Sequence, residues 1–169
     1  VMKELTDKQI STYQFKDDGT IPNNPTYPLV IYKDLLTSND QAEQILAHNN
    51  WLDAWRGGIF NQHHYHSNTH EVLAVIIGEA FLQLGGASGK QLAVAAGDVL
   101  ILPAGTGHKL VDSSNDFTVV GAYPNGISYD FCTGQSQERP QNVENIATVT
   151  LPAKDPLFGS DGPLFNYWQ

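Results

Sequence analysis

The residues best suited to chemistry lie together in one stretch, Gly58 to Gly78, which reads GIFNQHHYHSNTHEVLAVIIG. The stretch contains four histidines and one glutamate, and it continues directly into an apolar, β-branched segment. Imidazole nitrogens and carboxylate oxygens are common ligands of transition metal ions. The stretch therefore predicts a metal centre built next to a strand.

The spacing of two of these histidines favours one shared ion. Side chains alternate between the two faces of a strand, so His64 and His66 point the same way and Tyr65 points the other way. Two imidazoles on one face, roughly 7 Å apart along the strand, can converge on a single cation. The turn formers at 67–69 interrupt the strand, so that Glu71, at the start of the next strand, can turn back towards the same ion.

His70 offers an alternative to this carboxylate. It precedes Glu71 and points to the opposite face if the strand is regular. A β-bulge at this point would exchange the two side chains and give a site of three or four histidines without the carboxylate. The sequence alone leaves both arrangements open. His63 is expected to face away from His64, in the core or in support of a ligand, and His48 is expected to be exposed.

A second constellation lies at residues 97–112, which read GDVLILPAGTGHKLVD. The run Val99 to Leu102 is apolar throughout, as expected for a strand that is buried on both faces. The turn at 103–107 then delivers His108 to the start of the next strand. His108 is the only histidine in the C-terminal half of the chain, which makes it the natural partner of the first cluster.

The two stretches resemble the two sequence motifs of the cupin family. The first motif, G-x5-H-x-H, three or four residues, E-x6-G, is matched by Gly58, His64, His66, Glu71 and Gly78. The second, G-x5-P-x-G-x2-H-x3-N, is matched by Gly97, Pro103, Gly105 and His108, with Asp112 where the family usually has asparagine. More narrowly, HHYHSNTHEVL, PAGTGH, DFTVVGAYP and DPLFGSDGPL resemble the uncharacterised YjlB-like single-domain cupins of bacteria and fungi, from about Leu29 to the C-terminus.

This resemblance implies an all-β fold, the double-stranded β-helix or cupin jelly-roll barrel, and often a homodimer. It implies one divalent transition metal ion in the mouth of the barrel, held by His64, His66, Glu71 and His108. Such ligands suit iron, manganese, nickel, zinc or copper, and ligand identity does not choose among them. The resemblance does not imply a particular reaction.

The elements that position these residues are short strands, with one helix before them. The helix is predicted at Ser38 to Asn49, with Ser38 as its cap and Gln41 at the capping-box position, and Trp51 and Trp55 are expected to pack it onto the sheet. Short apolar runs alternate with Gly, Pro, Asn and Ser turns from about residue 55 onwards, which is typical of a barrel or sandwich. The predicted strands are Leu29–Tyr32, Ile59–Tyr65, Glu71–Ile77, Ala80–Leu84, Gln91–Ala95, Val99–Leu102, Lys109–Val111, Phe117–Tyr123 and, near the end, Ala147–Leu151.

We predict a single domain over residues 1–169. Its motif-bearing barrel core covers about 55–124, a strand and the helix cover about 26–50, and a C-terminal extension covers about 125–169. Residues 1 to about 25 are rich in turn formers and are expected to be irregular. The extension is expected to be ordered, because its apolar side chains should dock on the domain or on a second subunit: Leu157, Phe158, Leu164, Phe165 and Trp168.

The composition of the chain limits the classes of partner that we expect. The formal net charge of −9 repels phosphate backbones and anionic lipid, so we expect no nucleic acid and no membrane as partners. Cys132 is the only cysteine, which excludes an internal disulfide and fits a reducing compartment. We see no signal peptide and no window that is apolar enough to span a bilayer, and we expect a cytoplasmic protein.

Two functions follow as hypotheses. The first is a metal-dependent enzyme acting on a small molecule, either a dioxygenase or an isomerase or lyase, with unknown substrate and catalytic residues. The second is a non-catalytic cupin that binds or senses a small ligand, in which the metal is structural or anchors the effector. A structural role like that of seed-storage cupins is disfavoured, because those proteins carry two barrels. Arg56 and Tyr123 are candidates to hold a substrate, although surface pairing and core packing are the stronger expectations, and Gln83 is a candidate to face the barrel interior.

Overall fold

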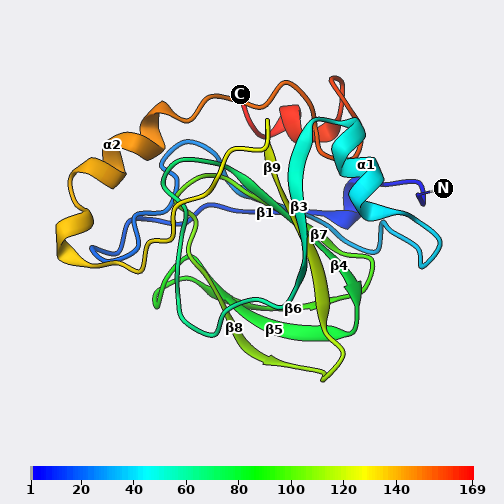
Figure 1. Ribbon diagram of the computed structural model, residues 1–169, viewed down its shortest axis with the longest axis horizontal. Coiled ribbons are helices and arrows are strands. Elements are labelled where there is room, and N and C mark those ends of the chain that lie inside the picture. Colours follow the sequence, from blue (N-terminus) through cyan, green and yellow to red (C-terminus); the bar gives the residue numbers. More distant parts are fainter. Residues whose placement is uncertain (1) are drawn as a thin grey trace.

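The computed structural model describes residues 2–169, and its strands form two antiparallel sheets that face each other around a barrel (Figure 1). The larger sheet has the order β1-β2-β7-β4-β9-β3, and the smaller has the order β6-β5-β8. The strands are β1 (Ile10–Tyr13), β2 (Leu29–Tyr32), β3 (Trp51–Gly57), β4 (Glu71–Ile77), β5 (Glu79–Leu84), β6 (Lys90–Ala95), β7 (Val99–Leu102), β8 (His108–Ser113) and β9 (Thr118–Pro124). The prediction of an all-β jelly-roll barrel is confirmed.

Two helices lie outside the barrel, α1 (Ala42–His48) and α2 (Gln141–Thr148), with short 3-10 turns at Asp7–Gln9, Ser136–Glu138 and Pro163–Asn166. Figure 1 shows α1 and the last, red segment of the chain together over one face of the larger sheet, while α2 lies at the opposite side of the view. Within residues 2–169 no helix has both the length and the apolarity needed to cross a membrane.

The central strands of the larger sheet are buried on both faces, which explains their unbroken apolar runs. Alternate residues of β4 enter two different clusters. Leu73 and Val75 point into the barrel, towards the smaller sheet. Val72 and Ala74 point outwards, towards α1 and the C-terminal extension. This regular alternation also fixes the face on which each residue at the start of β4 emerges.

Three neighbouring strands of the larger sheet, β7, β4 and β9, have ends that lie side by side. Glu71, the first residue of β4, pairs with Leu102, the last residue of β7. Its neighbour Val72 pairs with Ala122 of β9, so that Tyr123 lies next to Glu71 at these strand ends. The chain that leaves β7 then turns through Pro103 and its neighbours to reach His108 at the start of β8. The two sequence motifs therefore meet at one mouth of the barrel.

The expected helix start and one expected strand are wrong. The helix begins after Gln41 without a side-chain cap. The backbone and hydroxyl of Thr37 bond instead to the Asp40 carboxylate, and this turn uses the residues that were expected to form the first helical turn. Residues 59–65 form a loop with isolated bridges, and the strand lies earlier, at β3, because Trp55 packs on Gly121 of β9.

The two ends of the chain also differ from expectation. The region expected to be irregular, residues 1 to about 25, contains a strand within its described part, because β1 pairs with β2 at the edge of the larger sheet. The strand expected at Ala147–Leu151 is wrong, since α2 extends to Thr148 and residues 149–151 form no strand. The helix buries Ile146 against Tyr65 and Cys132. Ile77, the last residue of the strand predicted at Glu71–Ile77, is 42% exposed.

The C-terminal extension docks on the barrel, as expected. Leu157, Leu164 and Trp168 are buried in one cluster with Leu46 of α1 and Trp51 of β3, while Phe158 and Phe165 are partly buried. One buried carboxylate, that of Asp155, holds this segment together. Its two oxygens accept hydrogen bonds from the Tyr32 hydroxyl at 2.5 Å and from the backbone N–H groups of Leu157, Phe158 and Leu164.

Replacing Asp155 by alanine should therefore destabilise the protein. The change leaves the buried Tyr32 hydroxyl and three backbone donors without their acceptor, and we expect the free energy of unfolding to fall by about 3 kcal/mol. Urea unfolding followed by circular dichroism measures this change. The matched control is Asp161→Ala, an exposed position in the same segment, which should stay within about 0.5 kcal/mol of the parent. Equal stabilities of the two variants would contradict this role of Asp155.

Candidate metal centre

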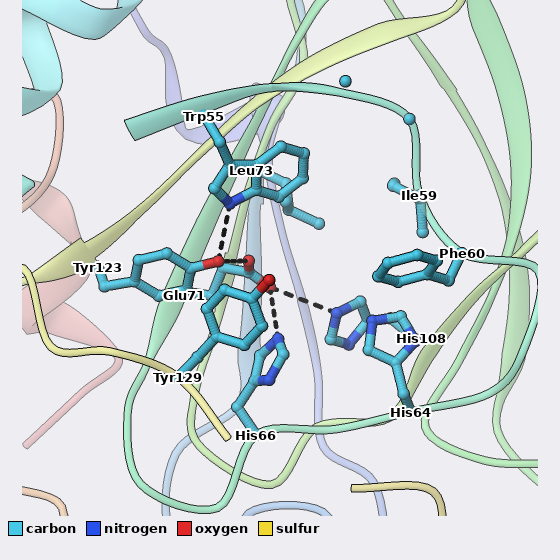
Figure 2. A pocket seen from close by; sticks show the side chains of 12 residues that line it. Trp55, Ile59, Phe60, His64, His66, Glu71, Leu73, His108, Tyr123 and Tyr129 are labelled. Carbon is cyan, nitrogen blue, oxygen red and sulfur yellow. Dashed lines mark hydrogen bonds and ion pairs between the residues drawn. The ribbon is translucent and has the colours of Figure 1, made fainter. Parts of the chain in front are cut away.

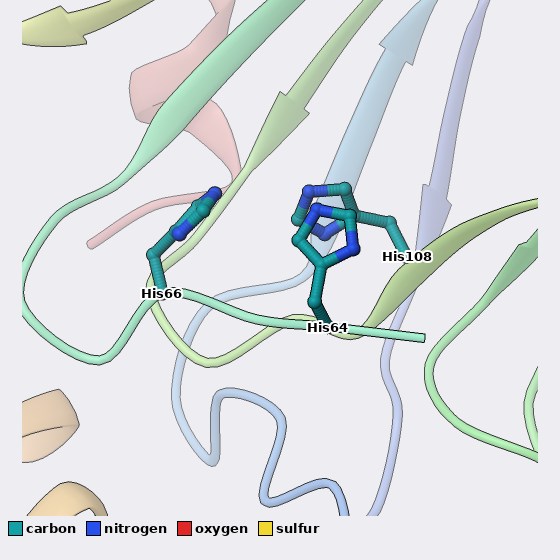
Figure 3. A group of neighbouring side chains, drawn as sticks. All are labelled: His64, His66 and His108. Atoms are coloured by element: carbon teal, nitrogen blue, oxygen red, sulfur yellow. The ribbon is translucent and has the colours of Figure 1, made fainter. Parts of the chain in front are cut away.

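Three histidines converge at the mouth of the barrel (Figure 3). One ring nitrogen each of His64, His66 and His108 lies within 4.8 Å of the other two, and all three residues are buried. The backbone brings two of them together, because His64 and His108 exchange N–H···O bonds of 3.1 and 2.9 Å in an isolated antiparallel bridge. Their ring centroids lie 4.1 Å apart. The structure thus gathers the three histidines of the two motifs in one place.

The turn before His108 depends on glycine. Gly105 has a φ of 91°, and a Cβ there would lie 2.7 Å from the carbonyl oxygen of Asn23. Its N–H donates to the carbonyl oxygen of His66 at 2.7 Å, so the turn is tied directly to the first histidine cluster. A side chain at this position would strain the backbone and clash with Asn23 and Ile146.

Backbone carbonyls fix the orientation of all three rings. The Nδ1 atoms of His64, His66 and His108 lie 2.8, 2.5 and 3.0 Å from the carbonyl oxygens of Gln62, Asp130 and Thr106, respectively. A carbonyl oxygen only accepts hydrogen bonds, so each Nδ1 carries the proton. The Nε2 atoms are therefore the ones left with free lone pairs. This is the tautomer in which a histidine binds a metal through Nε2.

Glu71 completes the cluster with a carboxylate oxygen. Its Oε1 lies 3.3 Å from Nε2 of both His66 and His108. This oxygen is buried and accepts no hydrogen bond within the described part of the chain. The other oxygen, Oε2, accepts from the Tyr123 hydroxyl at 2.8 Å, and Trp55 Nε1–H donates to that hydroxyl at 2.7 Å (Figure 2). A cation among these four atoms would satisfy the unpaired oxygen and the three lone pairs, so the donor set fits a metal ion.

Burial and the neighbouring groups shift the pKa values of the proposed ligands. Burial and, to a smaller extent, the neighbouring His108 lower the pKa of His64 to about 3. Burial alone would raise the pKa of Glu71, but the facing imidazoles of His108 and His66 outweigh it and hold this pKa far below its usual range. Burial alone would lower the pKa of His66, but the Glu71 carboxylate outweighs it and raises this pKa. Near neutral pH the carboxylate is therefore ionised and His64 is neutral, as metal binding requires.

His70 points away from the centre, on the other face of the strand. Its Nδ1 accepts from the backbone N–H of Ala104 at 2.9 Å, and its Nε2–H donates to the carbonyl oxygen of Thr150 at 3.0 Å. The ring packs 4.7 Å from that of Trp168. Because β4 is regular at its start, Glu71 faces inwards and His70 outwards. The alternative with a bulge is therefore not the arrangement found.

The other residues that the sequence singled out either support the site or lie at the surface. His63 accepts a hydrogen bond from the backbone N–H of Gly86, and His48 is exposed, as expected. Arg56 forms a surface ion pair with Glu43 at 2.7 Å. The proposal that Gln83 faces the interior is wrong, because Ala80, Leu82 and Leu84 occupy the inward positions of β5. Tyr123 does reach the site, where it orients Glu71.

The sequence did not reveal the contribution of the C-terminal extension. Asp130 supplies the carbonyl oxygen that holds His66 Nδ1, while its carboxylate accepts from the backbone and the hydroxyl of Ser67. Asn68 is bonded to the same segment, through the Ser128 carbonyl oxygen and the Asp130 N–H. Cys132 pairs with Tyr65 in a backbone bridge. No local pattern marks residues 128–132, since their role depends on a contact between segments about 60 residues apart.

The comparisons with known proteins agree with this geometry. The profile of the cupin domain family matches residues 53–120. The uncharacterized protein YjlB of Bacillus subtilis (strain 168) is 46% identical over 162 residues, which cover 96% of this chain and 98% of that protein. The chain belongs to the YjlB-like cupins. Asp130 and its neighbours lie outside the residues that the family profile matches, so this cupin completes its centre with a segment beyond the common motif region.

Solved structures with similarity to this cupin include vicilin from hazelnut, Corylus avellana, and a predicted oxalate decarboxylase from Thermotoga maritima. Vicilin is 18% identical with a TM-score of 0.39, and the match covers 77% of this chain and 39% of the vicilin chain. The Thermotoga protein is 16% identical with a TM-score of 0.37, and the match covers 72% of this chain and 98% of that chain. Similarity at this level does not identify an activity.

A cavity of about 270 Å³ lies directly over the centre of this cupin (Figure 2). Most of its wall is apolar or aromatic. Phe60 and Tyr129, which are 60% and 40% exposed, stand at its mouth, so the cavity is open to solvent. The lining residues are Trp55, Gly57, Gly58, Ile59, Phe60, His64, His66, Glu71, Leu73, His108, Tyr123 and Tyr129. The four proposed donors thus form the floor of a solvent-accessible site.

Replacing His66 by alanine should remove the metal without unfolding the barrel. We expect the metal content to fall from about one ion per chain to near zero, because three donors hold a divalent ion much more weakly than four. Elemental analysis measures the metal, and circular dichroism checks the β fold. His48→Ala, at an exposed position on α1, is the matched control and should keep its metal. Metal retained by the His66 variant would show that the ligand set is wrong.

Replacing Asp130 by alanine should weaken metal binding although Asp130 contributes no metal ligand. Ser67 loses both acceptors, and the segment that fixes the His66 ring loosens, so we expect an affinity loss of about tenfold. Competition with a chromophoric chelator measures the affinity. The control Glu144→Ala removes an exposed carboxylate from α2 and should leave it unchanged. Unchanged affinity in the Asp130 variant would contradict a supporting role of the extension.

Proposed function

We propose that this cupin is a metal-dependent enzyme of the dioxygenase type that acts on a small molecule. The observation that carries the proposal is the convergence of three imidazole lone pairs and one unpaired carboxylate oxygen on the floor of an open cavity. His64, His66, Glu71 and His108 would hold the ion. When bound, a redox-active ion such as iron, manganese, nickel or copper supplies Lewis acidity and electron transfer to dioxygen.

The cavity favours oxygenase chemistry over an isomerase or lyase. Isomerases and lyases need a positioned group that takes up and returns a proton. Among the described residues that line the cavity, the only carboxylate is Glu71, and there is no lysine. Tyr123 does not supply a base, because burial and the Glu71 carboxylate raise the pKa of its hydroxyl far above the usual range. Apart from the Tyr129 hydroxyl at the mouth, the wall thus offers a site for a substrate but no proton carrier separate from the proposed ligands.

The residues around the centre prepare it for such chemistry. Tyr123 and Trp55 hold Glu71 Oε2, so that Oε1 stays directed at the three imidazoles. Ile59 and Leu73 close the wall with apolar side chains. This apolar surface next to the donors lowers the local dielectric and strengthens the charge interactions there.

Binding without catalysis is the second candidate. The same apolar wall and the same lack of a separate acid or base suit a cupin that holds a small ligand and uses the ion as an anchor. The two functions differ in one respect, since only the enzyme consumes a co-substrate. Oxygen uptake therefore separates them.

The decisive assay loads the protein anaerobically with ferrous iron and then follows dissolved oxygen with a panel of small enols, diols and thiols. We expect at least one compound to give uptake that is catalytic and at least about tenfold faster than the same iron with the His66→Ala variant. The iron content of each sample is measured in parallel. If protein that holds one iron per chain consumes no oxygen with any compound, the oxygenase assignment fails and the binding function is favoured.

A further inference from the structure

We propose that this site selects a ligand that combines an uncharged ring with a metal-chelating end, and that Phe60 and Tyr129 are the residues that recognise the ring. The inference rests on the proposed metal site and adds the chemical class of its ligand. It follows from three properties of the cavity: the aromatic side chains at its mouth, the charge of its wall and its size.

Aromatic rings at the mouth of the cavity and beside it pack against the imidazoles of the proposed ligands. Phe60 lies edge-on to His64 at 5.6 Å between centroids, and Phe131 stacks on the same imidazole at 4.9 Å. Tyr129 lies 4.7 Å from the ring of His66. Figure 2 shows Phe60 and Tyr129 on opposite sides of the centre, so a flat molecule above the ion would lie between them. Offset and edge-to-face contacts with such rings favour an aromatic guest.

These rings are exposed to an unusual degree for aromatic side chains. Phe60, Phe131 and Tyr129 are 60%, 45% and 40% exposed. Exposed apolar surface that gathers around a cavity is typical of a ligand-binding site. The segment that carries Tyr129 and Phe131 is also rigidly held, because Asp130 between them is bonded to Ser67 and Asn68. The mouth is therefore a preformed surface, and covering it with a ligand would be favourable.

The charge of the wall argues against an anionic ligand. Glu71 is the one formally charged group among the described residues that line the cavity, and it is negative. Arg56 was a candidate from the sequence to hold a substrate, but its guanidinium is paired with Glu43 at the surface. A carboxylate or phosphate away from the chelating end would therefore lose its hydration without gaining a cationic partner. The part of the ligand outside the chelating end is accordingly uncharged.

The size of the cavity and the polar group at its mouth further define the ligand. A volume of about 270 Å³ equals roughly nine water molecules at liquid density, which suits a single ring with a short substituent. The Tyr129 hydroxyl makes no hydrogen bond to any of residues 2–169 and remains available to a polar group of the ligand. The Tyr123 hydroxyl, by contrast, is already bonded to both Trp55 and Glu71.

The test compares three hydroxamates that share one chelating head. Acetohydroxamate has no ring, benzohydroxamate has an uncharged ring, and para-carboxybenzohydroxamate has a ring with an anionic group. Their affinities for the full chain loaded with cobalt(II) are measured by titration of the cobalt absorption bands. We expect benzohydroxamate to bind at least about tenfold more tightly than each of the other two.

Variants connect this preference to the named residues. Phe60→Ala and Tyr129→Ala should each reduce the preference for the ring at least about threefold, while cobalt content and acetohydroxamate affinity stay the same. Tyr129→Phe keeps the ring and should keep the preference. Phe81→Ala, an aromatic residue that is 49% exposed on the outer face of β5, is the matched control and should change nothing.

The outcomes distinguish this inference from the proposed function. Equal affinities for acetohydroxamate and benzohydroxamate, or tightest binding of the carboxylated probe, would overturn the ligand class and leave the metal site standing. Loaded protein that binds no hydroxamate would overturn the ligand class and favour a closed coordination shell. Protein that takes up no cobalt would overturn both proposals. A change of oligomeric mass in Phe60→Ala, measured by sedimentation, would assign the aromatic mouth to a subunit contact and would also overturn the inference.

Discussion

The centre of this cupin depends on four potential ligand atoms that the fold holds close together in a buried position. Three backbone carbonyls fix the protons of His64, His66 and His108 on Nδ1, so their Nε2 lone pairs face one another. The buried Oε1 of Glu71 points into the same space without a hydrogen bond from the described residues. Lone pairs and an ionised carboxylate without a cation are unfavourable in a buried position, and one cation satisfies all four atoms. A bound cation would therefore stabilise the site.

The barrel supplies the rigidity that this arrangement needs. Glu71, Tyr123 and the turn to His108 come from the ends of three hydrogen-bonded strands, whose register leaves little freedom. The segment that carries His64 and His66 has no such sheet around it. It is held instead between the bridge to His108 on one side and the bridge to Cys132 on the other. The C-terminal extension is thus part of the functional site, and removal of Asp130 would loosen it.

Local spacing and the resemblance to the cupin motifs were sufficient to predict the barrel and to single out His64, His66, Glu71 and His108, which the structure brings together. The alternation along β4 follows from its apolar run, and it places Glu71 inwards and His70 outwards. The sequence could not show that no bulge interrupts this strand, because a bulge depends on the partner strands. Nor could it reveal Asp130, Tyr129 or Phe131, whose roles arise from contacts with the distant residues 60–68. The strand at β3 was missed because its position is set by the contact of Trp55 with Gly121.

The most direct test of this account is the anomalous diffraction of crystals of the metal-loaded protein, recorded on both sides of the absorption edge of the ion. The account predicts one anomalous peak that lies about 2.0–2.3 Å from Nε2 of His64, His66 and His108 and from Oε1 of Glu71. A peak bound through Nδ1, a peak that leaves Glu71 out, or a peak away from this cluster would contradict it.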